Sequence, residues 1–225
     1  MVNNSHQHPN IRISQLKSSW FDLLSESSAA LDFGNQIFVD LVNGYSNPVR
    51  HYHNLEHIER ILSLLEEAKD TLSNPHELKF SAWFHDYIYH PQAKDNEIKS
   101  AAYAKKVLRK LNIDPETIQS VTQIILSTQN HQPLRAGIDN LIFLDVDLAI
   151  LGTTPDQYLQ YAQGIRKEYD YLSDRDYQQG RTKVLTQFFA RNRIYYTEYF
   201  YQRLECSARN NLQTEINHLS CSQIN

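Results

Sequence analysis

Helical spacing of apolar residues is the feature that most constrains the fold of this chain. Apolar residues recur every three or four positions along most of the sequence, whereas the alternation typical of a half-buried strand is rare. Glycine is scarce and dispersed, with 6 in 225 residues. This pattern predicts an all-α protein, and the chain is long enough to bury a full hydrophobic core.

The breaks between the expected helices carry residues that start helices. Asp114 is a good N-cap before Pro115, and Thr154 precedes Pro155 in the same way. No linker rich in proline, glycine or serine divides the chain, so we expect a loose polar tail over residues 1–12 and one helical domain over residues 13–225. The predicted helices cover residues 13–29, 32–43, 54–73, 76–89, 94–111, 115–130, 140–151, 155–171, 175–191 and 195–218.

Charge and composition argue against several classes of partner. A formal net charge of −4 leaves no basic footprint for duplex nucleic acid, although a nucleotide or another small phosphate ester remains compatible with it. No apolar run approaches the roughly 20 residues that span a bilayer, and "MVNNSHQHPN" has no apolar signal segment. Cys206 and Cys221 lack CxxC spacing, which fits a reducing compartment. We therefore expect a cytoplasmic protein.

The stretch "VRHYHNLEHIERIL" places three histidines at the start of a helix. His57 lies one turn before Ile61 on the apolar stripe, so it points to the edge of the buried face, and His53 lies on the same side. His51 precedes the helix and is expected at the surface. A lone inward histidine is usually a core residue bonded to a carbonyl, so other segments must decide its role.

A second segment, "FSAWFHDYIYHP", brings His85 inward on a predicted helix, with Asp86 about 100° further round the axis. A neighbouring pair of this kind can reach one ion placed between the two side chains. An ionised aspartate beside residues such as Trp83 is costly to bury without a cation or strong donors. This pair therefore favours a metal site.

Two further segments each offer one more inward ligand. In "LIFLDVDLAILG", Asp145 and Asp147 face nearly opposite ways on a helix, so only one of them can point at a given ion. Both aspartates could instead be exposed, but the apolar surroundings fit that poorly. In "VTQIILSTQNHQP", His131 shares a face with Ile124 and is either a ligand or a helix-terminal cap.

The order His57, His85-Asp86, Asp147 resembles the HD superfamily of metal-dependent phosphohydrolases. The strings "YHNLEHI", "WFHDYIY", "DNEIKSA", "FLDVDLAILG" and "YAQGIRKEY" are similar to an uncharacterised bacterial branch of it, as is "RIYYTEYFYQRLECSARNNL" near the C-terminus. The resemblance implies a single-domain helical bundle of the HD type, with these four residues as ligands of a divalent ion. The ion would be Mn, Fe, Co, Ni, Zn or Mg.

The resemblance also separates the remaining candidates. Asp147 is preferred to Asp145 because the last aspartate of the family precedes a helical continuation like "DLAIL". His131 and His53 lie outside the minimal motif and are candidates for a second metal or for contacts around the first one. The double-histidine "HH" signature of two-metal members is missing, which favours a single ion.

The implied activity is hydrolysis of a small phosphate ester or nucleotide, by a water that the metal activates and that attacks phosphorus. Asp86 would orient this water, and Glu97 would act as general acid or base, unless it only complements a helix dipole. Asn96, Arg166 and Lys167 are the expected substrate contacts.

Other interpretations of the same residues stay open. Arg50 is a further cation for the phosphate, and Arg166 could instead pack on tyrosine rings or pair with Asp145. An HD-type site also supports di-iron oxygenase chemistry, which requires a second ion and hence His131 or His53. A non-catalytic HD module with a structural metal is the third hypothesis. The aromatic residues around Tyr195 are expected to form scaffold or the surface of a homo-oligomer.

Overall fold

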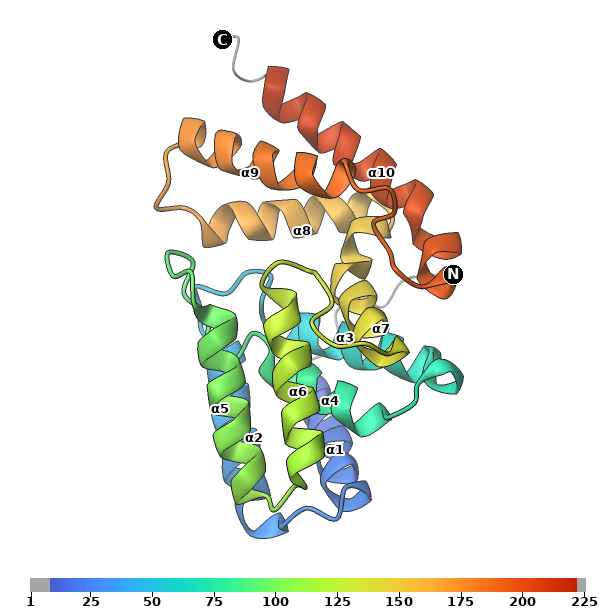
Figure 1. The fold of residues 1–225 in the computed structure, drawn as a ribbon. Helices are drawn as coiled ribbons and strands as arrows, with labels where there is room; N and C mark the ends of the chain where they lie inside the picture. Colours follow the sequence, from blue (N-terminus) through green and yellow to red (C-terminus); the bar gives the residue numbers. More distant parts are fainter. Residues whose placement is uncertain (1–8, 222–225) are drawn as a thin grey trace.

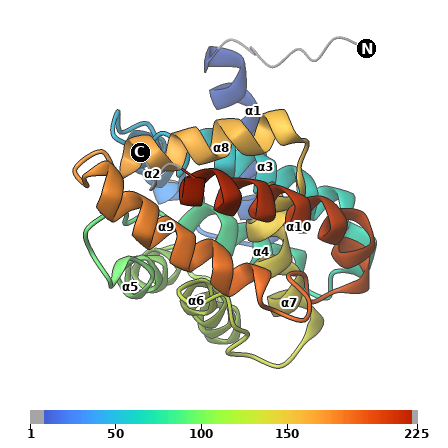
Figure 2. The same ribbon diagram turned by 90° about the horizontal axis from the view of Figure 1, so that it is seen from above.

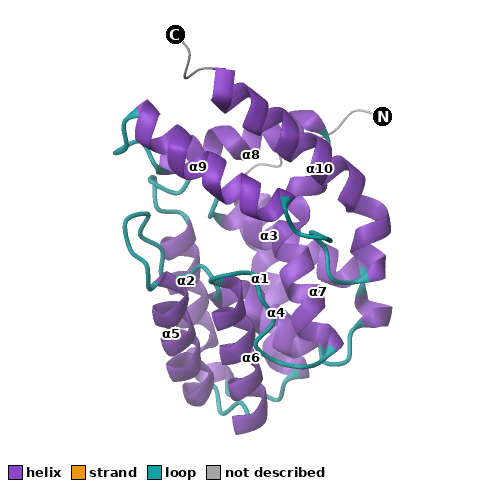
Figure 3. Cartoon of the chain, turned by 45° about the horizontal axis from the view of Figure 1, so that its top comes forward, coloured by secondary structure: helices purple, strands orange, loops and turns teal. Residues whose placement is uncertain are grey.

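The computed structural model describes residues 9–221, which form helices and loops with no strand in that range (Figures 1 and 3). The prediction of an all-α fold is confirmed. The α-helices are α1 (Pro9–Glu26), α2 (Gly34–Tyr45), α3 (Leu55–Glu67), α4 (Pro75–Phe84), α5 (Asn96–Lys110), α6 (Pro115–Thr128), α7 (Ile138–Asp147), α8 (Pro155–Glu168), α9 (Asp174–Phe189) and α10 (Glu198–Cys221). Three short 3-10 helices are η1 (Leu31–Phe33), η2 (Lys69–Thr71) and η3 (Leu148–Gly152).

The helices form a lower bundle and an upper layer. In Figure 1, α1, α2, α5 and α6 make the lower part, and α8, α9 and α10 lie across the top. Seen from above, α8, α9 and α10 cover the middle of the molecule (Figure 2). The helices α3, α4 and α7 lie between these two parts.

Two hydrophobic clusters meet at these middle helices. Trp20, Trp83 and Phe84 belong to the lower cluster, whereas Phe143 and Tyr195 belong to the upper one. Both α3 and α4 contribute residues to each cluster. The ends of these two helices are therefore held from both sides, which is a rigid place to present side chains.

Local capping explains where two important helices begin. The Asn54 side chain accepts hydrogen bonds from the backbone N–H groups of Glu56 and His57, and this starts α3. Asp114 caps α6 as the sequence predicts, with its carboxylate accepting from the N–H of Thr117. Thr154 accepts no capping hydrogen bond at the start of α8, and its hydroxyl donates to the Gln157 side chain.

The N-terminal prediction is wrong in part. Helix α1 already begins at Pro9, so residues 9–12 are not a loose tail. Arg12 forms ion pairs with Glu56 and Glu59 at 2.9 Å each, which ties the first turns of α1 to α3. The rest of the predicted tail, residues 1–8, lies outside the described residues.

The helix predicted over residues 76–89 also ends early, at Phe84. Beyond it the chain turns, and tertiary partners replace the helical hydrogen bonds. The Arg50 guanidinium donates to the carbonyls of Asp86 and Tyr87 at 2.7 Å each. Asp86 therefore projects from a turn and not from the helix surface that its spacing indicated.

The membrane-spanning potential of the helices, the two cysteines and the aromatic residues around Tyr195 were also addressed from the sequence. None of the helices within residues 9–221 is long and apolar enough to cross a membrane. Cys206 and Cys221 are both exposed free thiols. Ile194 and Tyr195 are fully buried, so this part of the C-terminal aromatic stripe belongs to the core.

Candidate metal centre

Two histidine rings meet where α3 begins and α4 ends. His57 lies in the first turn of α3, which the Asn54 cap holds, and His85 directly follows α4. Both rings are almost fully buried, and their Nε2 atoms are 3.1 Å apart. The Nδ1 of His85 lies 3.0 Å from the Ala82 carbonyl, which can only accept a hydrogen bond. Nδ1 therefore carries the proton, and in the neutral ring Nε2 keeps a lone pair that faces His57.

Two carboxylates complete this group. Asp86 Oδ2 lies 3.1 Å from His85 Nε2 and 3.6 Å from His57 Nε2. Asp147 Oδ1 lies 3.4 Å from His57 Nε2 and 3.6 Å from His85 Nε2. Ligands about 2.0–2.2 Å from one ion are themselves separated by about 3.0–3.5 Å. The spacing of His57, His85 and Asp147 therefore fits one divalent ion, and Asp86 contacts both histidines beside it.

The electrostatics of the group also favour a bound cation. Burial lowers the pKa of His85, but the charges of Asp86 and Asp147 outweigh it and hold that pKa well above its ordinary value. Burial lowers the pKa of His57, whereas contact with these histidines keeps the pKa of both aspartates low. The site thus attracts positive charge into a buried place, and a metal ion would supply it while the Nε2 atom of each histidine carries no proton.

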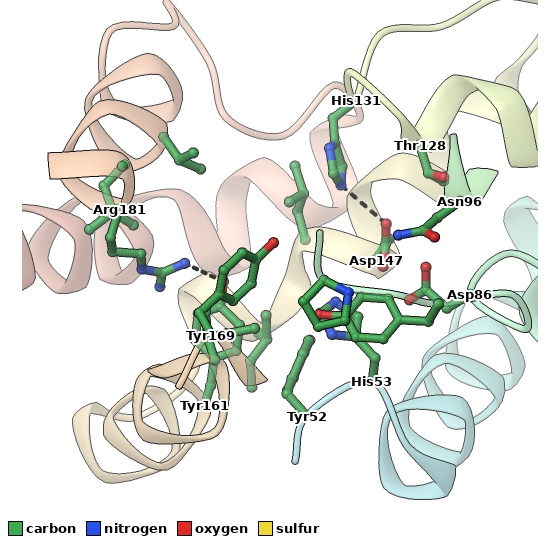
Figure 4. A pocket seen from close by; sticks show the side chains of 18 of the residues that line it. Tyr52, His53, Asp86, Asn96, Thr128, His131, Asp147, Tyr161, Tyr169 and Arg181 are labelled. Atoms are coloured by element: carbon green, nitrogen blue, oxygen red, sulfur yellow. Dashed lines mark hydrogen bonds and ion pairs between the residues drawn. The ribbon is translucent and has the colours of Figure 1, made fainter. Parts of the chain in front are cut away.

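His131 lies beside this group on the far side of Asp147. It follows α6 with a left-handed backbone conformation (φ 46°), and its Nε2 is 3.2 Å from Asp147 Oδ2 (Figure 4). The hydroxyl of Tyr196 donates to its backbone carbonyl, which fixes this turn. His131 thus contacts the carboxylate oxygen that is not nearest to His57.

His53 is held by a different acid. Its Nδ1 lies 2.6 Å from Glu168 Oε2, and its ring stacks on Tyr89 with centroids 4.4 Å apart. Burial lowers the pKa of His53, but the contact with Glu168 outweighs it and raises that pKa above the ordinary value. This contact fixes the orientation of the ring at the cavity edge.

Sequence reasoning missed Glu168, which organises the loop before α3. Its Oε1 accepts the backbone N–H groups of His51, Tyr52 and His53 at 2.7, 2.7 and 3.0 Å. Burial alone would raise its pKa, but these donors and the His53 ring lower it to about 2. The available signal was its position one turn after Ile165, on the inward face of α8.

Asp145 has a separate and structural explanation. It is fully buried and accepts the N–H groups of Tyr196 and Thr197 and the Thr197 hydroxyl, at 2.6–2.7 Å. The side chain therefore faces away from the histidines, as the spacing from Asp147 predicts. Arg166 is not its partner: the Arg166 guanidinium pairs with Asp174 at 2.7 Å.

The side chains of His57, His85, Asp86 and Asp147 are called the metal group below. A cavity of about 440 Å³ opens beside it. Asp86, Asp147 and Asn96 share its wall (Figure 4). Glu97 lines it as well. Burial raises the pKa of Glu97, and the charge of Asp86 adds to this. The Asn96 amide is already engaged, since it donates to the His90 carbonyl and accepts from the His90 N–H.

The cations predicted to bind substrate lie elsewhere. Arg166 does not line the cavity, and its guanidinium packs over the Tyr177 ring at 4.7 Å, which is the ring packing considered from the sequence. Lys167 is exposed and does not line the cavity either. Arg50 is buried and donates to three backbone carbonyls, so it connects the loop before α3 to the turn after α4. None of these three side chains lines the cavity.

The chain was compared with known families, proteins and structures, and only the geometry of the site bears on its function. No family model, no curated protein and no solved structure matches this chain. His57, His85 and Asp147 place ligand atoms within 4.8 Å of one another and could hold a metal ion. Asp86 lies at comparable distances from both histidines, so four of the residues singled out in the sequence are close together.

Proposed function

We propose that this protein is a metal-dependent phosphohydrolase of the HD type that acts on a small phosphate ester or nucleotide. The observation that carries the proposal is the convergence of His57, His85, Asp86 and Asp147 at the edge of a cavity. The histidines are 1–2% exposed in their side chains, whereas Asp86 and Asp147 are 16% and 11% exposed. An ion held here would have a buried histidine side and a carboxylate side turned toward a substrate, as hydrolytic metal sites require.

A divalent cation in this position would polarise a phosphoryl oxygen and lower the pKa of a water. The chain would supply the rest of the chemistry. A carboxylate oxygen of Asp86 would accept a hydrogen bond from the attacking water and orient it. Glu97, whose pKa is raised by burial, would carry the proton that the leaving oxygen needs. Arg166 and Lys167 do not line the cavity and are given no role in this proposal.

A second candidate function is suggested by His131. Its contact with Asp147 Oδ2 leaves one carboxylate oxygen toward His57 and the other toward His131. A carboxylate that bridges two ions has this arrangement, so a binuclear site with oxygenase chemistry is the alternative. The number of ions bound per chain separates the two functions.

The test is metal content and turnover in matched variants. Untagged protein would be purified without added metal, incubated with each of Mn, Fe, Co, Ni, Zn and Mg, and measured by mass spectrometry. Wild type would be compared with H57Q and D86N, and with the controls H51Q and D32N, which change exposed side chains. Circular dichroism would show which variants are folded.

We expect one ion per chain in the wild type and both controls, and loss of the ion in H57Q and D86N. Release of phosphate from a panel of esters should follow the same division. Two iron ions per chain would favour the oxygenase. Bound metal without turnover, with unfolding of D86N, would favour the non-catalytic module. Absence of metal in the wild type would refute all three.

A further inference from the structure

The cavity beside the metal group has two chemically different halves. The polar half carries Asp86, Asp147, Asn96 and His131 (Figure 4). The other half lies under α8 and α9 and is lined by aliphatic and aromatic side chains. These include Ile165, Leu172, Val184, Leu185 and Phe188. A ligand that spans the cavity therefore meets charge at one end and apolar surface at the other.

The charged groups of the lining are unevenly balanced. Three acids face the cavity, namely Asp86, Glu97 and Asp147. Arg181 is the one lysine or arginine among the described residues of the lining. A metal ion would compensate the acids at one end, but the apolar half needs a cation of its own to accept a second anionic group.

Arg181 is not available for this purpose. Its Nε and one terminal nitrogen contact the two oxygens of Glu215 at 2.8 and 3.1 Å, and the other terminal nitrogen donates to the Tyr161 hydroxyl at 3.2 Å. The guanidinium also lies 5.1 Å from the centre of the Tyr161 ring. It is 7% exposed, so its charge is neutralised and enclosed. Arg181 thus lines the apolar half of the cavity as a paired residue and adds no free positive charge to it.

Aromatic rings line the passage between the two halves. The Tyr161 ring packs edge-on against Tyr52, with centroids 4.6 Å apart. Tyr89, Tyr169 and Tyr177 also face the cavity. Rings at these positions offer faces and edges on which another aromatic ring can stack. A volume of about 440 Å³ has room for one phosphate and a small ring system.

We propose that the substrate is a phosphate monoester whose alcohol part is aromatic and uncharged. This inference rests on the proposed hydrolase function and names its substrate class. The phosphate lies toward Asp86 and Asp147, and the ring lies between Tyr161 and the apolar side chains of α9. In the reaction the oxygen of water bonds to phosphorus and the ester P–O bond breaks. One proton of water ends on the released alcohol and the other stays with the phosphate products.

Binding of stable analogues tests the class without requiring turnover. Benzylphosphonate, 4-carboxybenzylphosphonate and methylphosphonate would be titrated calorimetrically into metal-loaded protein. We expect benzylphosphonate to bind at least about tenfold more tightly than either of the other two, because it alone fills the apolar half without burying an unpaired anion. Equal affinities, or a preference for the carboxylate, would overturn the inference.

A charge variant probes the same half from the protein side. Val184 lines the cavity and is 43% exposed, so V184K adds a cation there without disturbing the core. V39K changes a similarly exposed valine of α2, 41% exposed, and is the matched control. V184K should remove the discrimination against 4-carboxybenzylphosphonate, and V39K should keep it. If V184K leaves the preference unchanged, the ring does not occupy this half.

Hydrolysis distinguishes failure of this inference from failure of the proposed function. Phenyl phosphate should have a kcat/KM at least about tenfold above that of 4-carboxyphenyl phosphate and of glycerol phosphate. If 4-carboxyphenyl phosphate or glycerol phosphate is cleaved better, the proposed substrate class is wrong, but the proposed hydrolase function is supported. If no ester is cleaved although benzylphosphonate binds as expected, the hydrolase function is wrong, and the substrate class falls with it.

Discussion

Asp145 and Asp147 are two residues apart on the same helix, yet their surroundings differ completely. Asp145 accepts three hydrogen bonds from Tyr196 and Thr197. These two residues belong to the loop that precedes α10, so the bonds fix that loop. Asp147 is within 3.6 Å of ring nitrogens of three histidines. The first carboxylate is satisfied by the protein, whereas the second is surrounded by groups that themselves bind cations.

The same contrast separates other buried acids of the molecule from the metal group. Glu168 and Glu205 each accept backbone N–H groups from a loop that precedes a helix. Donors of this kind cannot be ligands, so a carboxylate that they saturate organises the backbone. Glu168 also contacts one imidazole nitrogen, that of His53, but Asp86 and Asp147 face those of two and three histidines. The identity of the neighbours, and not burial, distinguishes a structural acid from a candidate metal ligand.

The largest effect that tests this contrast is expected for D147N. Loss of this ligand should weaken metal binding at least about 100-fold, since changes around a metal site outside the ligands already cost 10–100-fold. The increase in Tm on addition of metal should disappear with it. Differential scanning calorimetry with and without the metal measures this, and D32N should keep the full increase. An unchanged metal response in D147N would remove it from the ligand set.

The converse change, D145N, should act on stability instead. The amide would place an N–H₂ group against a donor of Tyr196 or Thr197, which costs about 2–3 kcal/mol in a buried site. Urea unfolding of the metal-free protein measures the loss. The folded variant should still bind one ion per chain. Loss of metal with unchanged stability would mean that the roles of the two aspartates are exchanged.

E168Q should lower the free energy of unfolding by about 2 kcal/mol at neutral pH, because the ionised carboxylate accepts several buried donors. The pKa of Glu168 falls from 4.5 to about 2 on folding. The part due to the Glu168 charge is therefore complete above pH 4.5, as long as His53 stays protonated, and is lost as the pH falls toward 2. The difference between wild type and E168Q should shrink over this range. A difference that stays constant with pH would show that the charge of Glu168 is not what stabilises the loop.

The smallest effect is expected for H131Q. If His131 only orients Asp147, the variant should still bind one ion, about tenfold more weakly, with little change in stability. Metal titration followed by mass spectrometry measures both the affinity and the number of ions. A fall from two ions to one would instead make His131 a ligand of a second ion and would favour the oxygenase.

Much of the fold and part of the site follow from local sequence. The 3.6-residue spacing of apolar residues predicts the helices because each must bury one stripe. The same spacing brings His57 inward and sends Asp145 and Asp147 in opposite directions, as observed. Helix ends were less predictable. The turn after Phe84 depends on Arg50, which is distant in sequence and supplies donors for the carbonyls of Asp86 and Tyr87.

Charged residues outside the metal group show most clearly what local sequence does not predict. Arg166, Lys167 and Glu168 are consecutive on α8, and the cations were predicted to serve the site. Helix α8 is oriented about its axis so that Glu168 faces the loop before α3, whereas Arg166 pairs with Asp174. Composition and spacing do not reveal which face of α8 the neighbouring loop covers, because that depends on how the upper layer packs on the bundle.

By itself, the sequence determined that the protein is helical and which histidines and aspartates are available as ligands, because helical periodicity and side-chain chemistry are local properties. Only the tertiary structure decided that Asp86 and Asp147 both lie against His57 and His85 and that Arg181 is neutralised by Glu215. Distances between side chains from separate helices depend on the packing of the whole core. A pattern within one helix does not contain that information.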